Sequence, residues 1–273
     1  MNKHLHLQEN RNRQPTITAP ELMTIYLFGQ LNGHFKKRHI YSFINHYWAD
    51  WFPALPSYQA FNRRLNLLEA HFQTVFAHLL THLNKEQKTF GVDHLIDSMP
   101  IISAIGSKSK RAKVAQAVAA TGFCAVKQTN FHGVRLHLIA RRKTGKLPRP
   151  TQMWLRQGNV HDLTALKEQA HLPTNMTLFA DKAYVGRDFK KHLQASRQIN
   201  LITPIKKPKK KQLSTDEKSY NKMVSSIRQP IESFFKWLID KTDIQRASAV
   251  RSTDGLLVHC IGKLSFALLL LTF

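Results

Sequence analysis

Residues 90–100 read FGVDHLIDSMP, and the character of the chain changes at this stretch. Apolar and polar side chains half-alternate up to Asp97, and alternation with a period of two is typical of a β-strand. We expect the strand to end at Asp97, because the Ser-Met-Pro sequence that follows has the composition of a turn. Nothing upstream of residue 90 has a strand pattern.

The chain after this strand alternates between strand-like and helix-like segments. Short apolar runs predict further strands at residues 131–140, 151–156, 176–180 and 200–205. Helix-sized segments lie between them at residues 161–170 and 187–195. Strands separated by helices predict an α/β domain.

Helix signals dominate the first part of the chain. Thr18 begins a capping box with Pro20 near the helix start, and apolar residues recur at helical spacing over residues 40–51. Ser57 is placed to cap a short third helix, and a longer helix is expected over residues 65–83. This part of the chain therefore predicts an all-helical region.

The two patterns divide the chain into an all-α region, residues 1–88, and an α/β region, residues 89–273. The most apolar stretch, residues 264–273, is far shorter than the roughly 20 residues that span a bilayer, so we expect a core helix and no membrane partner. The polar N-terminus predicts no signal peptide. Cys124 and Cys260 have no CxxC or histidine spacing for zinc, which favours a reduced, cytoplasmic setting.

The chain is strongly basic, with 41 Lys+Arg against 17 Asp+Glu and a formal net charge of +24. Its 273 residues, 42% of them hydrophobic, suffice for a substantial core and exclude a disordered basic tail. The charge predicts a polyanionic partner bound mainly through its phosphates, with affinity that falls steeply as salt rises. Charge alone fits a ribosomal or chaperone-like basic protein equally well.

Three carboxylates nevertheless lie in structured motifs of this basic chain. Asp97 ends the first predicted strand, Asp181 directly follows another, and Glu232 lies in a helix-like segment with apolar neighbours. Rigid elements could aim all three at one point. Carboxylates hold pairs of Mg²⁺ or Mn²⁺ ions about 4 Å apart, which activate a nucleophile and stabilise a phosphodiester under attack.

Neighbouring polar residues have other interpretations. Asp93 shares a strand face with Asp97 and is the rival for the first position, although it lacks the Ser-Met-Pro sequence. Asp162 is interpreted as a helix N-cap and Asp188 as a partner of a helix dipole. His161 is interpreted as a supporting or structural residue, since a two-metal site needs no histidine base. A single acidic residue is usually a surface charge or a cap, so the coincidence of three indicates a site.

The chain resembles a bacterial insertion-sequence transposase of the DDE class, within it the group numbered nine hundred and eighty-two. The resemblance spans residues 90–240 and is carried by the segments IDSMPI, FHGVRLHLIA, GNVHDLTAL, ADKAYVG and RQPIESFFKWL. It implies an RNase H-like fold, with a mixed sheet flanked by helices, behind a helix-turn-helix-like DNA-binding region. It also implies Asp97, Asp181 and Glu232 as catalytic residues and as ligands of two Mg²⁺ or Mn²⁺ ions.

Related insertion-sequence families place a tyrosine, an arginine and a lysine around the glutamate. Arg228 fits the arginine, whereas Ser225 and Ile239 occupy the other two positions, and Lys236 or Lys241 could substitute for the lysine. In a continuous helix, Arg228 and Lys236 share a face with Glu232, where they contact DNA phosphates or form salt bridges to Glu232. Pro230 would alternatively begin that helix.

Further basic residues are candidates for DNA contact. Arg63 and Arg64 lie on a capped helix of the kind that reads a major groove, or simply on a solvated face. Lys182 is either a phosphate contact or a solvent-facing side chain. The last candidates form a lysine-rich loop suited to neutralising the DNA backbone or to keeping the chain soluble: Lys206, Lys207, Lys209, Lys210 and Lys211.

The resemblance implies DNA transposition. Such an enzyme would bind the terminal inverted repeats of its own element, cut the double-stranded DNA there and join the ends to target DNA. It would act in the bacterial cytoplasm, at the nucleoid, as a homodimer on DNA. Two alternatives stay open from the sequence: an RNase H-like nuclease without strand transfer, and a catalytically inactive DNA-binding repressor.

Overall fold

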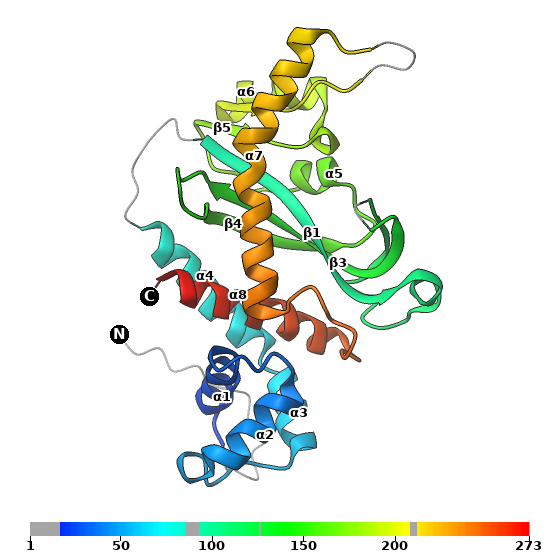
Figure 1. Cartoon of the computed structure of the whole chain (residues 1–273). Helices are drawn as coiled ribbons and strands as arrows, with labels where there is room; N and C mark the ends of the chain where they lie inside the picture. The colour runs from blue at the N-terminus through cyan, green and yellow to red at the C-terminus, as the bar shows by residue number, and fades with distance from the viewer. Residues whose placement is uncertain (1–16, 86–92, 126, 208–211, 273) are drawn as a thin grey trace. The chain divides into compact units, whose positions relative to one another are not determined.

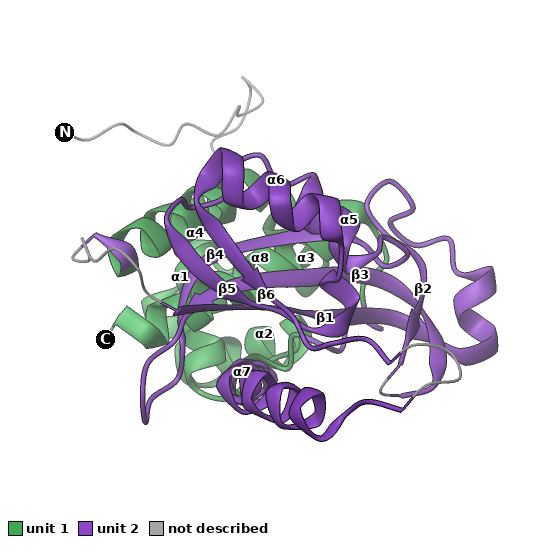
Figure 2. Ribbon diagram, turned by 90° about the horizontal axis from the view of Figure 1, so that it is seen from above, with its two compact units in different colours: residues 1–83, 240–244, 250–273 green, residues 84–239, 245–249 purple. Residues whose placement is uncertain are grey.

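The computed structural model describes residues 17–85, 93–125, 127–207 and 212–272. The elements form two compact units, coloured separately in Figure 2, and each is described by itself. The first comprises Met1–Leu83, Asp240–Ile244 and Val250–Phe273, and the second comprises Asn84–Ile239 and Gln245–Ala249. The expected strand start at residues 90–92 lies outside the described residues.

The first unit is helical, as the sequence predicted. Thr18 caps the first helix, with its hydroxyl accepting from the Glu21 backbone N–H at 3.3 Å, and the Ser57 hydroxyl caps the third helix through the Ala60 N–H at 3.5 Å. The expected helix over residues 65–83 begins only at Glu69. The helices of this unit are α1 (Ala19–Leu31), α2 (Lys37–Tyr47), α3 (Tyr58–Asn66), α4 (Glu69–Asn84) and α8 (Thr253–Thr272), with the short turn η1 (Ala49–Trp51).

The C-terminal helix α8 is longer than the apolar run predicted. Its 20 residues are long and apolar enough to cross a membrane by length and composition, yet 67% of the apolar window is buried inside the protein, as in a core helix. It packs with α1 and α3, so it groups with the N-terminal helices, whereas the sequence analysis placed it with the sheet. The functional division of the chain stays a prediction.

The second unit is built on one mixed sheet of six strands (Figure 1). The central strand, β1 (Asp93–Ile105), runs antiparallel to one neighbour, β3 (Thr129–Arg141), and parallel to the other, β5 (Met176–Phe179). This arrangement, flanked by helices, confirms the expected α/β class and its RNase H-like sheet. The strands are β1 (Asp93–Ile105), β2 (Ala120–Cys124), β3 (Thr129–Arg141), β4 (Arg149–Gln157), β5 (Met176–Phe179) and β6 (Ile199–Ile202), and the order is β2-β3-β1-β5-β6, with β4 also pairing β3.

The first strand does not end at Asp97, and the expected turn at Ser-Met-Pro is wrong. β1 continues to Ile105, with Pro100 paired opposite Arg135 of β3. At Ile102 the backbone N–H and C=O bond to residues 245 and 247, on the side away from β3. Residues two apart in a strand direct their backbone N–H groups to the same side, so the nitrogen of Pro100 also faces away from β3. The N–H that proline lacks would therefore not have bonded to β3.

Helices cover both faces of this sheet. Figure 2 shows α5 (Asp162–Lys167) and α6 (Arg187–Arg197) on one face and α7 (Thr215–Thr242) on the other. Ile96, Leu178 and Tyr184 are among the buried residues of the core on the α5 and α6 face. α7 runs through Pro230 without a break, so the helix does not begin there.

Candidate active site

Asp97 lies near the middle of β1 and faces a buried arginine. Its Oδ2 accepts a hydrogen bond from Arg228 Nη2 at 2.9 Å, and its Oδ1 accepts one from the Ser98 backbone N–H at 2.8 Å. Burial raises the pKa of Asp97 to about 6, although Arg228 and the Ser98 N–H lower it. The nearby charges of Asp181 and Asp162 contribute to this raised pKa. Asp97 therefore sits among other carboxylates, with one arginine neutralising it.

The sheet register brings Asp181 beside Asp97. In the parallel β1–β5 pair, Leu95 lies opposite Phe179, and two residues further along each chain come Asp97 and Asp181. Residues that match in a parallel register point to the same face. Asp181 lies two residues beyond the end of β5 and caps the short turn η3 (Lys182–Tyr184), because its Oδ1 accepts from the Lys182 N–H. Two of the three predicted carboxylates therefore meet on one face.

Glu232 lies on α7, which covers a face of the same sheet (Figure 2). Arg228, one turn earlier, is 7% exposed and pairs with Asp97, whereas Glu232 is exposed. No ion pair joins Arg228 or Lys236 to Glu232 among the described residues. The continuous helix does place all three at intervals of four residues, as one of the two readings of Pro230 required.

A fourth carboxylate, Asp162, lies closer to Asp97 than the sequence analysis anticipated. Its Oδ1 accepts a hydrogen bond from Ser98 Oγ at 2.6 Å, and its charge acts on Asp97. The interpretation of Asp162 as an N-cap is wrong: His161 caps α5, its Nδ1 accepting from the Leu163 N–H at 3.3 Å, and Asp162 is the first helical residue. This frees the Asp162 carboxylate to bond to β1.

Behind Ser98 lies a buried histidine that the sequence did not single out. His137 of β3 is fully buried, stacks on Trp154 with ring centroids 5.2 Å apart, and has its Nδ1 3.9 Å from Asp162. Burial lowers the pKa of His137 to about 4, against the opposing effect of Asp162, so the ring is neutral near pH 7. His137 lies opposite Ser98 in the β1–β3 pair. This proximity could not be inferred from the spacing of the two residues in the sequence.

The carboxylates do not converge into a complete metal site. Among residues 17–85, 93–125, 127–207 and 212–272, no group of three Asp, Glu, His or Cys side chains could hold an ion. Asp97 and Asp181 supply hard oxygen donors, and the charge of Asp181 acts on Asp97. Arg228 holds one oxygen of Asp97, and Glu232 is exposed. The donor chemistry fits a hard divalent cation, and the third ligand is not assembled.

The other predicted residues have varied surroundings. Asp93, the rival of Asp97, forms a partly exposed pair with Arg142 at 3.8 Å. Arg64 is half-buried and donates to the Ile17 carbonyl, whereas Arg63 is exposed. The remaining described cations of the DNA-contact set are exposed: Lys182, Lys206, Lys207 and Lys236. Lys209, Lys210 and Lys211 lie outside the described residues.

The mixed sheet, with Asp97 on one strand and Asp181 just beyond the adjacent parallel strand, defines an RNase H-like α/β protein with an acidic site. Residues 103–265 match the family described as the transposase DDE domain. The match covers more than half of the 273 residues, so the chain belongs to this family. It includes Asp181 and Glu232 and begins six residues after Asp97.

Membership of this family indicates an enzyme that cleaves DNA in transposition. Enzymes of this class use divalent metal ions. No curated protein and no solved structure matches the chain.

Proposed function

We propose that this protein is an insertion-sequence transposase that binds the ends of its element, cuts the DNA there and joins the 3′ ends to target DNA. The single observation that supports this most is the register of the parallel β1–β5 pair, which, extended by two residues, brings Asp97 and Asp181 to one face of the sheet, next to a buried arginine. The group numbered nine hundred and eighty-two is the proposed subfamily, and a homodimer on DNA is the proposed assembly, because two ends must be cut together.

Asp97, Asp181 and Glu232 are the proposed catalytic residues and would hold two Mg²⁺ or Mn²⁺ ions. When bound, such ions activate water or a 3′ hydroxyl and stabilise the charge at phosphorus. The chain itself would orient the ligands: the Ser98 N–H holds Asp97, and the Lys182 N–H holds Asp181. Arg228, which pairs with Asp97 in this structure, would contact a phosphate of DNA.

Contacts outside this site would secure the DNA. Arg63 on α3 is the proposed reader of the terminal repeats, with Arg64 partly committed to the Ile17 carbonyl. The proposed backbone contacts lie on the second unit and follow β6 or flank the carboxylates: Lys182, Lys206, Lys207, Lys209, Lys210, Lys211, Arg228 and Lys236. The proposed setting is the bacterial cytoplasm.

The test is cleavage of a plasmid that carries the flanking inverted repeats, with Mg²⁺, Mn²⁺ or EDTA. We expect cuts at the repeat boundary with either ion and none with EDTA. Asp97→Asn, Asp181→Asn and Glu232→Gln should each slow cleavage about 100-fold or more, because each removes charge stabilisation at the reacting phosphate. Gel-shift binding to the repeats should remain.

Asp93→Asn is the matched control for Asp97→Asn, because Asp93 lies on the same strand and pairs only with surface Arg142 among the ion pairs of the described residues. It should cleave at the wild-type rate. A variant of the proposed triad that still cleaves at that rate removes its residue from the catalytic set. Labelled ends that are cut but never joined would favour a nuclease without strand transfer.

A catalytically inactive DNA-binding protein is the second candidate function. It is favoured by the exposed Glu232 and by Arg228, which occupies an oxygen of Asp97. It predicts binding to the repeats that needs no divalent ion, and no cuts with Mg²⁺ or Mn²⁺. The same plasmid assay therefore decides between the two candidates.

A further inference from the structure

An aromatic side chain on the edge strand β2 lies between two hollows of the second unit. Phe123 of β2 is 50% exposed and lines a hollow of about 450 Å³ beside η2 (Gly106–Arg111). It also lines a second hollow, of about 420 Å³, that extends to His161 and Asp162. A lone exposed apolar residue needs no explanation. Phe123 differs because cationic and amide groups without partners surround it.

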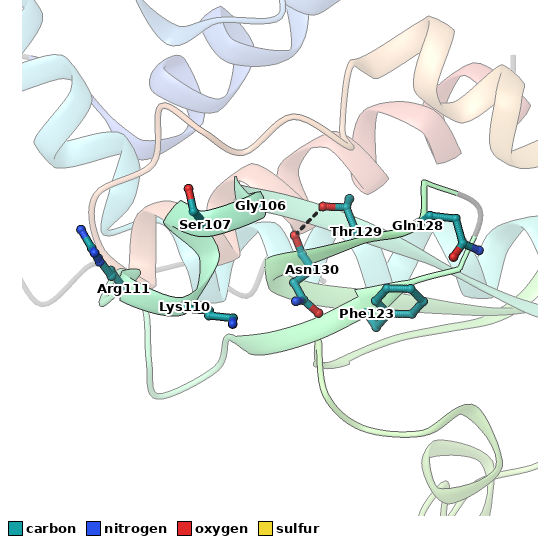
Figure 3. Close-up of a pocket in the computed structure, with 8 residues that line it drawn as sticks. All are labelled: Gly106, Ser107, Lys110, Arg111, Phe123, Gln128, Thr129 and Asn130. Carbon is teal, nitrogen blue, oxygen red and sulfur yellow. Dashed lines mark hydrogen bonds between the residues drawn. The ribbon is translucent and has the colours of Figure 1, made fainter.

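These polar groups lie along the first hollow. Figure 3 shows Lys110 extending toward Asn130 and Phe123, while Arg111 points away at the far end. The side chains of Asn130, Lys110 and Arg111 form no hydrogen bond or ion pair with the described residues. None of the described residues that line this hollow is acidic. The hollow therefore offers an aromatic face, an amide and the positive charge of Lys110 to a ligand, with the charge of Arg111 at its far end.

The walls of this hollow are fixed by hydrogen bonds. Ser109 of η2 is fully buried, and its Oγ donates to the Gly106 carbonyl at 2.7 Å. Thr121 Oγ1 of β2 donates to the Ser109 carbonyl at 2.9 Å, which ties η2 to the strand that carries Phe123. Asn130 lies opposite Phe123 in the β2–β3 pair. These bonds hold η2, β2 and β3 together, so the backbone positions of Phe123, Asn130, Lys110 and Arg111 are fixed relative to one another.

One guanidinium group connects this hollow to the carboxylates. Arg135 donates to the Phe123 carbonyl at 2.7 Å and to the Gly158 carbonyl at 3.2 Å, and it lies 3.5 Å from Ser98 Oγ. Ser98 directly follows Asp97 in β1. Arg135 therefore links the backbone of Phe123, which lines the hollow, to Ser98, the residue after the proposed catalytic Asp97.

We propose that the hollow lined by Lys110, Arg111, Phe123 and Asn130 binds an unpaired nucleotide of a DNA strand. The base would stack on Phe123 with the Asn130 amide at its edge, and Lys110 and Arg111 would contact the flanking phosphates. Stacking on an exposed aromatic ring combined with nearby cations is how proteins hold single-stranded DNA. An asparagine amide can both donate to and accept from a base edge. The choice of DNA rests on the proposed function.

The test is binding of a single-stranded oligonucleotide that contains 2-aminopurine, with full-length protein in EDTA so that no cleavage occurs. Stacking quenches the fluorescence of this base. We expect quenching by the wild-type protein and by Phe123→Tyr, which keeps the ring. Phe123→Ala should abolish the quenching and raise the Kd about tenfold. Lys110→Gln should weaken binding and make it less sensitive to salt.

Met223→Ala is the matched control, because Met223 is 47% exposed on α7 and lies outside the hollow. It should bind and quench as the wild type does, and circular dichroism of each variant checks its folding. Equal quenching and Kd in wild-type protein and Phe123→Ala would overturn the proposal, as would an equal loss of binding to a fully paired duplex. Oligonucleotide binding through Phe123 without any plasmid cleavage would refute only the proposed transposase activity.

Discussion

Lys263 shows how a single buried charge couples the stability of the first unit to pH. The side chain is 1% exposed, and its ammonium donates to the Thr242 carbonyl at the end of α7. Burial lowers the pKa of Lys263 from 10.5 to about 8, although Asp243 and Cys260 act in the opposite direction. Between these pH values the unfolded chain holds more protons than the folded chain. The free energy of unfolding therefore rises with pH across this window.

Lys263→Met should flatten this rise. We expect the gain in the free energy of unfolding between pH 8 and 10.5 to shrink by up to about 3 kcal/mol, because the buried charge no longer titrates. The pKa of Lys37, which burial and the charge of Lys263 lower to about 8, should also rise. Urea unfolding across the pH range measures the effect. Exposed Lys241→Met is the control and should keep the wild-type slope, and an unchanged slope in Lys263→Met would contradict the argument.

Helix ends and strand patterns could be predicted from sequence where the signal is local. The Thr18 capping box and the Ser57 cap both form, because each depends on residues within one turn. The strand at residues 131–140 corresponds to β3, whose buried run is continuous enough to be seen in the sequence. Local chemistry was sufficient for these elements.

Elements that depend on a neighbour were missed or misplaced. Pro100 was read as the end of a turn, yet it lies within β1 because its missing N–H faces away from β3. β2 was not predicted, since its five residues gain their strand character from pairing with β3. In the candidate site, the sequence pattern placed Asp97 in a strand and Asp181 after one, although Asp97 lies within β1 and not at its end. Asp162 and His137 depend on contacts between distant segments.

The close approach of β2 to the end of β4 gives a prediction about packing. A Cβ on Gly122 would lie 1.9 Å from the Gly158 carbonyl oxygen, which is backbone and cannot move aside cheaply. Gly122→Ala should therefore lower the free energy of unfolding by about 3 kcal/mol, measured by urea unfolding.

Gly145→Ala is the control for this prediction. Gly145 has φ +68° but faces open space, so alanine there should cost only about 1 kcal/mol from its backbone conformation. Equal destabilisation by the two substitutions would show that the approach of Gly122 to Gly158 is not what limits the packing of β2.

The chain as a whole carries +24 formal charges, while its candidate site gathers acidic residues. These two features are compatible, because long-range attraction to DNA comes from the summed positive charge and the local carboxylates act only over a short range. Lys206 and Lys207 are exposed beyond β6, and the lysine-rich sequence continues through residues 209–211. This arrangement predicts that binding depends on charge at many positions.

The affinity for repeat DNA should therefore fall about 10³-fold or more between 50 and 200 mM salt, as for a protein that neutralises six or more phosphates. Replacing Lys206, Lys207 and the lysines at 209–211 with Gln should reduce the slope of log K against log salt, because fewer counterions are released. The preference for repeat over unrelated DNA should stay the same, since lysines at the backbone read no bases. Fluorescence anisotropy over a salt series measures both. Arg63→Gln is the contrasting variant and should lower the sequence preference. A lysine variant that loses the preference but keeps the slope would place base recognition in this loop.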